Sequence, residues 1–157
     1  MAFRILFVCL GNICRSPLAE GVFRRVAAEA GVADRFEVDS AGTGPWHVDE
    51  PPDRRMRDTA RRRGVPIDDL RGRQVSAADL RDFDLVLAMD RDVLHDTLYL
   101  APDADAPHVR LFREYDPEPG DYQVPDPYYG GPGGFDEVFE IVERTARAML
   151  ERLVDDG

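Results

Sequence analysis

Two kinds of hydrophobic pattern alternate along the chain. Phe3–Val8 and Phe83–Met89 are nearly continuous apolar runs, which are typical of strands buried in the centre of a parallel sheet. Phe36–Ala41 and Val109–Phe112 show weaker strand patterns. We therefore predict four strands, with helices in the segments between them.

The predicted helices combine apolar residues at helical spacing with capping residues. In the first, Leu18, Val22 and Val26 recur every fourth residue, and Gly31 follows as a natural stop. The sequence predicts helices over Pro17–Ala30, Asp53–Arg63, Ser76–Leu80, a segment capped by Asp90, and Gly134–Val154. This alternation indicates an α/β fold with a parallel sheet, in which ligands bind at the carboxyl ends of the strands.

The composition predicts one soluble domain spanning residues 1–157. Its hydrophobic fraction of 43% is ordinary, and neither a run of ~20 apolar residues nor a signal-peptide pattern is present. We therefore expect no membrane association. The net charge of −11 argues against nucleic acid as a partner, because a phosphate backbone requires a basic face. Every basic residue is Arg, which we attribute to genome composition.

Two cysteines five residues apart, one of them a candidate thiolate, indicate a reducing compartment. We expect a cytoplasmic protein with no metal and no cofactor, because no cluster of His and Cys has zinc-site spacing. His47, His95 and His108 are not expected to be catalytic, since none lies beside a second motif.

The stretch after the first strand carries the candidate chemistry. Cys9 ends that strand, and a short turn leads to Ser16, the predicted N-cap of a helix with Pro17 as its first residue. N–H groups of such a turn, the helix dipole and the forked donors of Arg15 all favour a bound phosphate and a thiolate. The sequence therefore predicts an anion pocket with a nucleophile at its floor.

Small and polar residues in the same turn are suited to shaping that pocket. Gly11 allows close approach of the backbone, and Asn12 can hydrogen-bond within the loop or to a neighbour. Ser16 can donate to the Cys9 sulfur. A lone Cys is more often a small buried apolar residue, but Cys, Asn, Arg and Ser together in a strand–loop–helix context favour a functional site.

A long loop near the C-terminus supplies candidate partners for this pocket. Arg113–Gly133 has no periodic apolar segment, and loops of that length are often functional. Residue patterns alone do not choose a general acid among its carboxylates, which are Glu114, Asp116, Glu118, Asp121 and Asp126. Tyr128 and Tyr129 either wall the pocket or pack the loop onto the surface, and Trp46 is either an opposite wall or a buried anchor.

The motif Cys9–Leu10–Gly11–Asn12–Ile13–Cys14–Arg15–Ser16, with Asp126–Pro127–Tyr128–Tyr129 near the C-terminus, closely resembles the low-molecular-weight protein tyrosine phosphatases. The resemblance covers nearly the whole chain. It implies a single flavodoxin-like domain with a four-stranded parallel sheet in order 2-1-3-4 and helices on both faces. It also implies hydrolysis of phosphotyrosine and small aryl phosphates without a metal.

The family's mechanism, transferred to this sequence, gives each residue a role. Cys9 attacks phosphorus, while Arg15 and the amides from Leu10 through Arg15 bind the phosphoryl oxygens. Ser16 lowers the basicity of the sulfur. Asp126 protonates the phenolic oxygen and then activates water. The resemblance further implies that Cys14 forms a protective disulfide with Cys9, and that Trp46, Tyr128 and Tyr129 line the substrate pocket.

Partners and competing functions follow from the same resemblance. We expect tyrosine-phosphorylated proteins as substrates, a cognate tyrosine kinase because the paired tyrosines can be phosphorylated in this family, and a monomer. Protein-arginine phosphatases resemble this chain but typically have Thr at the position of Ile13. Arsenate reductases need cysteines beyond Cys9 and Cys14. A non-catalytic phosphopeptide-binding module would require neither Cys9 nor Asp126.

One position departs from the family pattern. Leu70 stands where many members have a His that supports the loop Asn together with a Ser. We expect Ser40 to be the retained partner of Asn12, with the support of Asn12 weaker or rebuilt.

Overall fold

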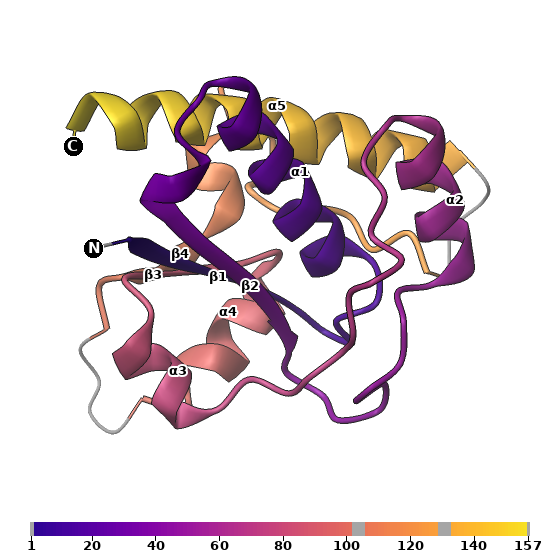
Figure 1. Cartoon of the computed structure of the whole chain (residues 1–157). Coiled ribbons are helices and arrows are strands. Elements are labelled where there is room, and N and C mark those ends of the chain that lie inside the picture. The colour runs from indigo at the N-terminus through magenta and orange to yellow at the C-terminus, as the bar shows by residue number, and fades with distance from the viewer. Residues whose placement is uncertain (1, 102–105, 129–132, 157) are drawn as a thin grey trace.

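Four parallel strands form the centre of the computed structural model, which describes residues 2–101, 106–128 and 133–156. They are β1 (Phe3–Cys9), β2 (Phe36–Gly42), β3 (Leu85–Ala88) and β4 (Val109–Leu111). Their order in the sheet is β2-β1-β3-β4, which confirms the topology implied by the family resemblance (Figure 1).

Helices cover both faces of this sheet (Figure 1). One layer contains α1 (Arg15–Glu29), α2 (Arg54–Arg62) and α5 (Gly133–Asp156), and the other contains α3 (Ala77–Asp82) and α4 (Arg91–Leu98). Two short 3-10 helices, η1 (Ala33–Arg35) and η2 (Phe112–Tyr115), complete the described elements.

Alternating side chains of β1 divide the core into two halves. Ile5 and Phe7 pack into the layer of α1 and α5, whereas Leu6 and Val8 pack into the layer of α3 and α4. All four side chains are fully buried, because a strand with neighbours on both edges and helices on both faces has no side in contact with solvent. This burial explains the continuous apolar run in the sequence.

The carboxyl end of β1 lies where the direction of the chain's crossovers reverses. Val8 is paired with Ala41 of β2 on one side and with Ala88 of β3 on the other. Connections that leave β1 toward both sides open a crevice at this end of the sheet. Cys9, the last residue of β1, stands in that crevice.

The third and fourth strands are shorter than predicted. Phe83 follows α3 as its C-terminal cap, so the third strand begins at Leu85 and not at Phe83. Phe112 begins η2 and is not part of the fourth strand. The long loop therefore has some structure of its own, since Glu114 accepts a hydrogen bond from the Leu111 amide at 2.9 Å and closes the turn.

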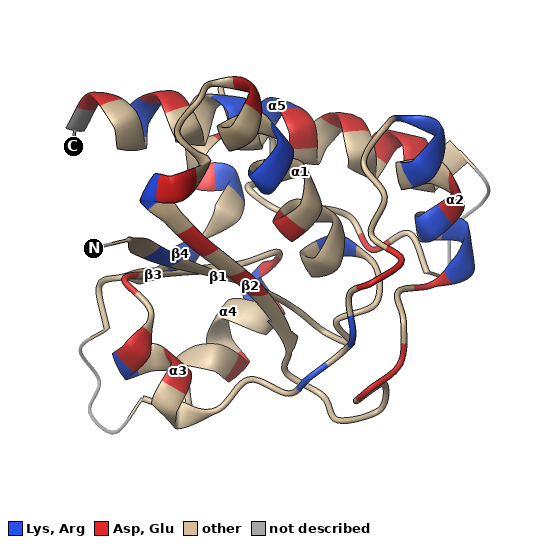
Figure 2. Ribbon diagram, viewed as in Figure 1, with Lys and Arg blue, Asp and Glu red and all other residues tan. Residues whose placement is uncertain are grey.

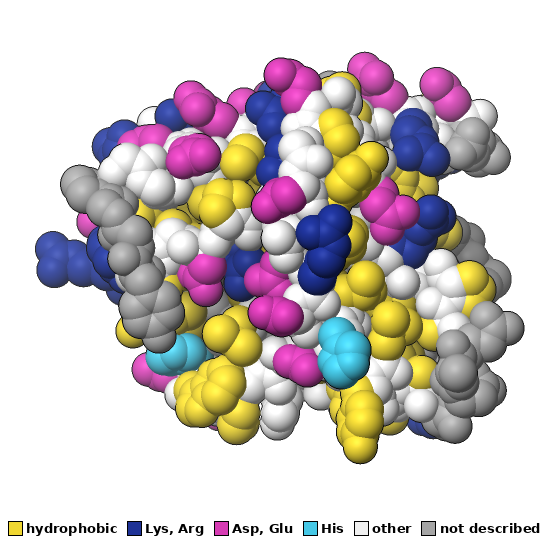
Figure 3. Space-filling model, turned by 180° about the vertical axis from the view of Figure 1, so that it is seen from behind, with side chains coloured by type: hydrophobic (Ala, Val, Ile, Leu, Met, Phe, Trp, Pro, Cys, Tyr) yellow, Lys and Arg dark blue, Asp and Glu magenta, His cyan; other side chains and the backbone are white. Residues whose placement is uncertain are grey.

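Charged residues recur along α2 and α5, whereas the strands carry few of them, among them Glu37 and Asp39 of β2 (Figure 2). From the back, the surface shows acidic and basic side chains interspersed, with apolar side chains gathered along the lower edge (Figure 3). Among the described residues, no helix is long and apolar enough to cross a membrane.

Candidate active site

The Cys9 loop, residues 9–16, connects β1 directly to α1. The helix begins at Arg15, with Cys14 as the N-cap residue and no side-chain capping bond. The predicted capping role of Ser16 is therefore wrong, and Pro17 is the third helical residue. Pro is tolerated there because the first-turn amides of a helix have no intrahelical acceptor.

The hydroxyl of Ser16 is used inside the loop. It lies 3.0 Å from the Cys9 sulfur and accepts a hydrogen bond of 2.8 Å from the Asn12 side-chain amide. Because a thiolate can only accept, Ser16 donates its single proton to Cys9 when the sulfur is ionised. The predicted contact between Ser16 and Cys9 is thus present.

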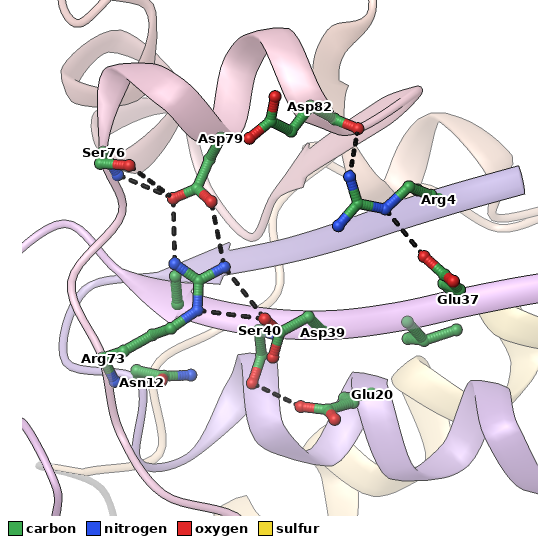
Figure 4. Close-up of polar contacts among 12 residues, drawn as sticks. Arg4, Asn12, Glu20, Glu37, Asp39, Ser40, Arg73, Ser76, Asp79 and Asp82 are labelled. Carbon is green, nitrogen blue, oxygen red and sulfur yellow. Dashed lines mark hydrogen bonds and ion pairs between the residues drawn. The ribbon is translucent and has the colours of Figure 1, made fainter.

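Asn12 shapes the turn of the loop. Its φ angle of 58° is in the left-handed region, which Asn tolerates better than most residues. Its side-chain oxygen accepts a 3.0 Å hydrogen bond from the backbone amide of Arg73. The Arg73 guanidinium is itself fixed by two bonds to Asp79, at 3.0 and 3.2 Å, and by Asp39 at 3.1 Å (Figure 4). The Asn12 side chain is therefore fixed by the backbone of Arg73, which is 61 residues away in sequence.

Ser40 is not the partner of Asn12. Its hydroxyl donates to Glu20 at 2.7 Å, on the other side of β2 from Arg73 (Figure 4). Burial raises the pKa of Glu20, although the hydrogen bond from Ser40 opposes this shift. Leu70, at the position of the family His, packs half-buried against the core. The support of Asn12 is thus rebuilt from Arg73.

The Cys9 loop lies directly on the end of β2. A Cβ atom at Gly42 would lie 3.0 Å from backbone atoms of Leu10, Gly11 and Asn12, so Gly42 is required for this close approach. The carbonyls of Cys9 and Leu10 accept hydrogen bonds from Thr43 and Gly44 at 3.0 and 2.9 Å. These bonds fix the loop against the segment that leads to Trp46.

Arg15 crosses beneath the site as a buried cation, with 3% of its side chain exposed. One guanidinium nitrogen donates to Asp90 at 2.7 Å and to the Val124 carbonyl at 2.9 Å. The other lies 3.6 Å from the Asp126 carboxylate. Burial alone would lower the pKa of Arg15, but the charges of Cys9 and Asp90 outweigh it, so this pKa is raised.

A cavity of about 330 Å³ opens above these groups. Nine predicted site residues line it, namely Cys9, Leu10, Gly11, Ile13, Cys14, Arg15, Trp46, Asp126 and Tyr128. Asn12 and Ser16 are buried and shape the loop. Trp46 is not a buried anchor, because it is 64% exposed at the rim. Tyr129 lies outside the described residues.

The acid loop, which we define as residues 113–128, places its carboxylates differently. Asp126 lines the cavity together with Cys9. Asp116 is enclosed and ion-paired with Arg113 and Arg144. Glu114 accepts hydrogen bonds from the Leu111 amide in the η2 turn and from Arg110. The choice of Asp126, which the residue patterns left open, is therefore supported by geometry.

Two residues at the site were not among the predicted ones. Asp90 was expected to cap a helix, and it does accept from the Val93 amide at 2.8 Å, but it also pairs with Arg15. His47 lines the cavity, and its ring lies 2.9 Å from Glu50. The pairing of Asp90 with Arg15 spans 75 residues and so leaves no local pattern. His47 reaches the cavity because the fold brings its segment against the Cys9 loop.

Comparisons with known proteins agree with this geometry. Residues 4–157 match the family model described as low molecular weight phosphotyrosine protein phosphatase. The chain belongs to this family. A low molecular weight protein-tyrosine-phosphatase from Streptomyces coelicolor is 46% identical over 96% of this chain and 93% of its own length.

Solved structures of this family share the whole fold. A protein tyrosine phosphatase from Entamoeba histolytica superposes with a TM-score of 0.94 at 35% identity, and the match covers 99% of both chains. A Drosophila arginine phosphatase is also similar, with a TM-score of 0.87, 30% identity and coverage of 95% of this chain and 96% of its own. The fold alone therefore does not choose between tyrosine and arginine.

The surroundings of the second cysteine, Cys14, disfavour its ionised form. Cys14 is buried beside Cys9, and both are free thiols. Burial raises the pKa of the Cys14 thiol, and the nearby charges of Asp53 and Cys9 raise it further. Among the described residues, no group of three or more His, Cys, Asp or Glu side chains is arranged to hold a metal ion.

Proposed function

We propose that the chain hydrolyses phosphotyrosine in proteins, and small aryl phosphates, through a cysteinyl-phosphate intermediate. The observation that carries this proposal is the convergence of three groups on one cavity. Cys9 and Arg15 come from the β1–α1 connection and Asp126 comes from the acid loop, more than 100 residues away in sequence. A nucleophile, a phosphate-binding cation and a proton donor are the groups that this reaction needs.

In the first step, the Cys9 thiolate attacks phosphorus and the bond from phosphorus to the phenolic oxygen breaks. Asp126 gives its proton to that oxygen, so the phenol leaves neutral. Arg15 and the N–H groups of the Cys9 loop hold the remaining phosphoryl oxygens. The loop can offer N–H groups to an anion because its carbonyls are engaged elsewhere: those of Cys9, Leu10 and Ile13 accept from other segments, and that of Cys14 accepts from Leu18 in α1.

In the second step, water attacks the phosphorus of the cysteinyl phosphate. Asp126, now ionised, accepts a proton from this water, the sulfur–phosphorus bond breaks, and inorganic phosphate and the Cys9 thiolate are released. Ser16 stabilises the leaving thiolate, since its hydroxyl lies 3.0 Å from the sulfur. In this step the ionised Asp126 can pair with Arg15, whose guanidinium lies 3.6 Å from it, and this contact keeps the carboxylate near the reaction centre.

The walls of the cavity favour an aromatic substrate. Ile13 and Leu10 form apolar sides, and Trp46 and Tyr128 stand at the rim, 64% and 38% exposed. Such walls suit the flat ring of phosphotyrosine, which can stack on them. A protein-arginine phosphatase remains the closest alternative, because a similar solved structure bears that name.

A substrate panel tests this proposal. We expect kcat/KM for a phosphotyrosine peptide to exceed that for phosphoarginine and for a phosphoserine peptide by at least ~100-fold, because the ring contacts discriminate in the transition state. Faster turnover of phosphoarginine would replace the substrate assignment but keep the nucleophile. Binding of the phosphotyrosine peptide without any turnover would indicate a binding module.

We also propose that tyrosine-phosphorylated proteins are its substrates, that a cognate tyrosine kinase phosphorylates Tyr128 or Tyr129, and that the chain acts as a monomer. Tyr128 is accessible to a kinase, because 38% of it is exposed at the cavity rim. Light scattering on the purified chain and mass spectrometry after kinase treatment test these assignments. A dimer or an unmodified Tyr-containing peptide would contradict them.

A further inference from the structure

Arg55, in the first turn of α2, is tied to the Cys9 loop through Asp53. Asp53 is the N-cap residue of α2, and its carboxylate accepts from the Arg55 backbone amide at 2.8 Å. The Arg55 guanidinium contacts both oxygens of the same carboxylate, at 3.2 and 3.1 Å. The backbone amide of Asp53 donates to the Ile13 carbonyl at 2.7 Å. One end of Arg55 is therefore anchored to the wall of the cavity that carries the nucleophile.

The same guanidinium is also tied to the acid loop. It donates to the Tyr128 carbonyl at 3.2 Å, and its central carbon lies 5.4 Å from the Tyr128 ring centroid. It lies 4.7 Å from the ring centroid of Phe135, which is 2% exposed near the start of α5. Both distances are within the range of cation–π attraction.

Tyr128 connects Arg55 to Asp126, the proposed proton donor. Its backbone amide donates to the Asp126 carboxylate at 3.0 Å, so the position of Tyr128 fixes the direction of that carboxylate. A continuous chain of contacts therefore runs from Ile13 through Asp53, Arg55 and Tyr128 to Asp126.

We propose that Arg55 is a positioning residue that sets the acid loop, and with it Asp126, over Cys9. The proposal rests on the proposed function. The side chain of Arg55 is 49% exposed, so its ion pair with Asp53 contributes little to the stability of the fold. Its effect is geometric, because a shift of about 1 Å in a catalytic group costs up to about 100-fold in rate.

Lysine cannot replace Arg55 in this position. The contacts to two carboxylate oxygens, a carbonyl and two rings use the planar fork of a guanidinium, whereas an ammonium is a compact point charge. Arg55→Lys therefore keeps the charge and loses the geometry. Arg54→Ala is the matched control, since the neighbouring Arg54 is 86% exposed and its ion pair with Asp58 spans 4.0 Å.

The experiment compares two leaving groups. Asp126 matters most for a poor leaving group, so kcat/KM is measured with a phosphotyrosine peptide and with 4-nitrophenyl phosphate. We expect Arg55→Ala to lower kcat/KM about tenfold with the phosphotyrosine peptide and less than about threefold with 4-nitrophenyl phosphate. Arg55→Lys is expected to fall between Arg55→Ala and wild type. Arg54→Ala is expected to match wild type with both substrates, and no variant should lower Tm by more than about 3 °C.

A double mutant separates this inference from the proposed function. If Arg55 acts through Asp126, the tenfold effect of Arg55→Ala disappears in an Asp126→Asn background. An equal loss with both leaving groups, or a full loss in the Asp126→Asn background, would overturn the role of Arg55 while leaving the phosphatase intact. If Asp126→Asn alone costs nothing with the phosphotyrosine peptide, the acid assignment and the role of Arg55 both fail. Should Arg55→Ala not fold, Arg55→Lys carries the same comparisons.

Discussion

The Cys9 loop and the acid loop meet at one cavity but are fixed by different kinds of contact. Within the Cys9 loop, the Cys9–Ser16 and Asn12–Ser16 contacts join residues seven and four positions apart. The acid loop is fixed by distant segments, such as Arg15, whose bond to the Val124 carbonyl spans 109 residues. The contacts of the Cys9 sulfur are thus local, although Arg73 also holds the loop from 61 residues away. The acid loop, by contrast, reaches the cavity through tertiary contacts such as those of Arg15.

Because the Cys9 loop supplies the nucleophile, we expect substitutions in it to lower the rate of the chemical step itself. The largest effect is expected for Cys9→Ser, which removes the nucleophile and should lower turnover of aryl phosphates by at least ~10⁴-fold. Inorganic phosphate should still raise the Tm of this variant, because Arg15 and the loop amides remain. Near-normal turnover by Cys9→Ser would contradict the assignment of the nucleophile.

Asp126→Asn tests the acid loop in the same way and should have the next largest effect. We expect kcat/KM to fall by ~10²- to 10³-fold with a phosphotyrosine peptide, and by much less with 4-nitrophenyl phosphate, whose leaving group needs no proton. Asp121→Asn is the control, since Asp121 belongs to the same loop but is not among the residues that line the Cys9 cavity. If the two variants lose the same activity, the proton donor is elsewhere.

Asp116 tests how strongly the acid loop depends on its distant anchors. Its side chain is fully enclosed, and it accepts from Arg113 at 2.9 Å, from Arg144 at 2.8 Å and from the Glu118 amide at 2.8 Å. Asp116→Asn removes the buried charge that Arg113 and Arg144 share, so we expect a loss of about 3 kcal/mol in the free energy of unfolding at pH 7. Urea unfolding measures this loss.

The same variant has a defined pH dependence. Burial alone would raise the pKa of Asp116, but hydrogen bonds from Arg144, the Glu118 amide and Arg113 outweigh it and lower this pKa from 3.8 to about 2. The folded-state value is therefore below the unfolded one, so the stabilisation is complete above pH ~4 and is lost as the pH falls toward about 2. The stability gap between wild type and Asp116→Asn should close over this range. A gap that does not change with pH would contradict the ion-pair account.

The contrast between the loops also explains what the sequence could predict. The order of strands and helices, and the placement of Cys9 at the end of a central strand, follow from local hydrophobic patterns. Local rules failed at Ser16, because its hydroxyl is needed by Cys9 and Asn12 and so does not cap the helix. The sequence pattern correctly predicts that Asp90 caps a helix, but it does not indicate the pairing of Asp90 with Arg15, 75 residues away.

Tertiary contacts decided the remaining assignments. Sequence patterns left Asp116 and Asp126 equivalent, and the fold separates them by enclosing one and exposing the other to the cavity. Ser40 was paired with the wrong side chain, because a residue on a strand contacts whichever helix covers its face. Here that is α1, whose Glu20 accepts from Ser40.

The smallest effect is expected for Cys14, and it concerns recovery from oxidation. Peroxide would convert the Cys9 thiolate to a sulfenic acid with release of hydroxide. The Cys14 thiol then condenses with this sulfenic acid: the sulfur–oxygen bond of Cys9 breaks, water leaves with the Cys14 proton, and a disulfide forms that dithiothreitol reduces. Both thiols belong to the same loop and line the same cavity.

Cys14→Ser removes this route, so the sulfenic acid proceeds to the irreversible sulfinic acid. After peroxide and then dithiothreitol, we expect the variant to regain less than about half of the activity fraction that wild type regains, each normalised to its own untreated activity. Mass spectrometry of wild type should detect a peptide pair linked through Cys9 and Cys14. Equal recovery by both proteins would show that the Cys9 loop supplies the nucleophile without protecting it, and protection would then have to come from outside the loop.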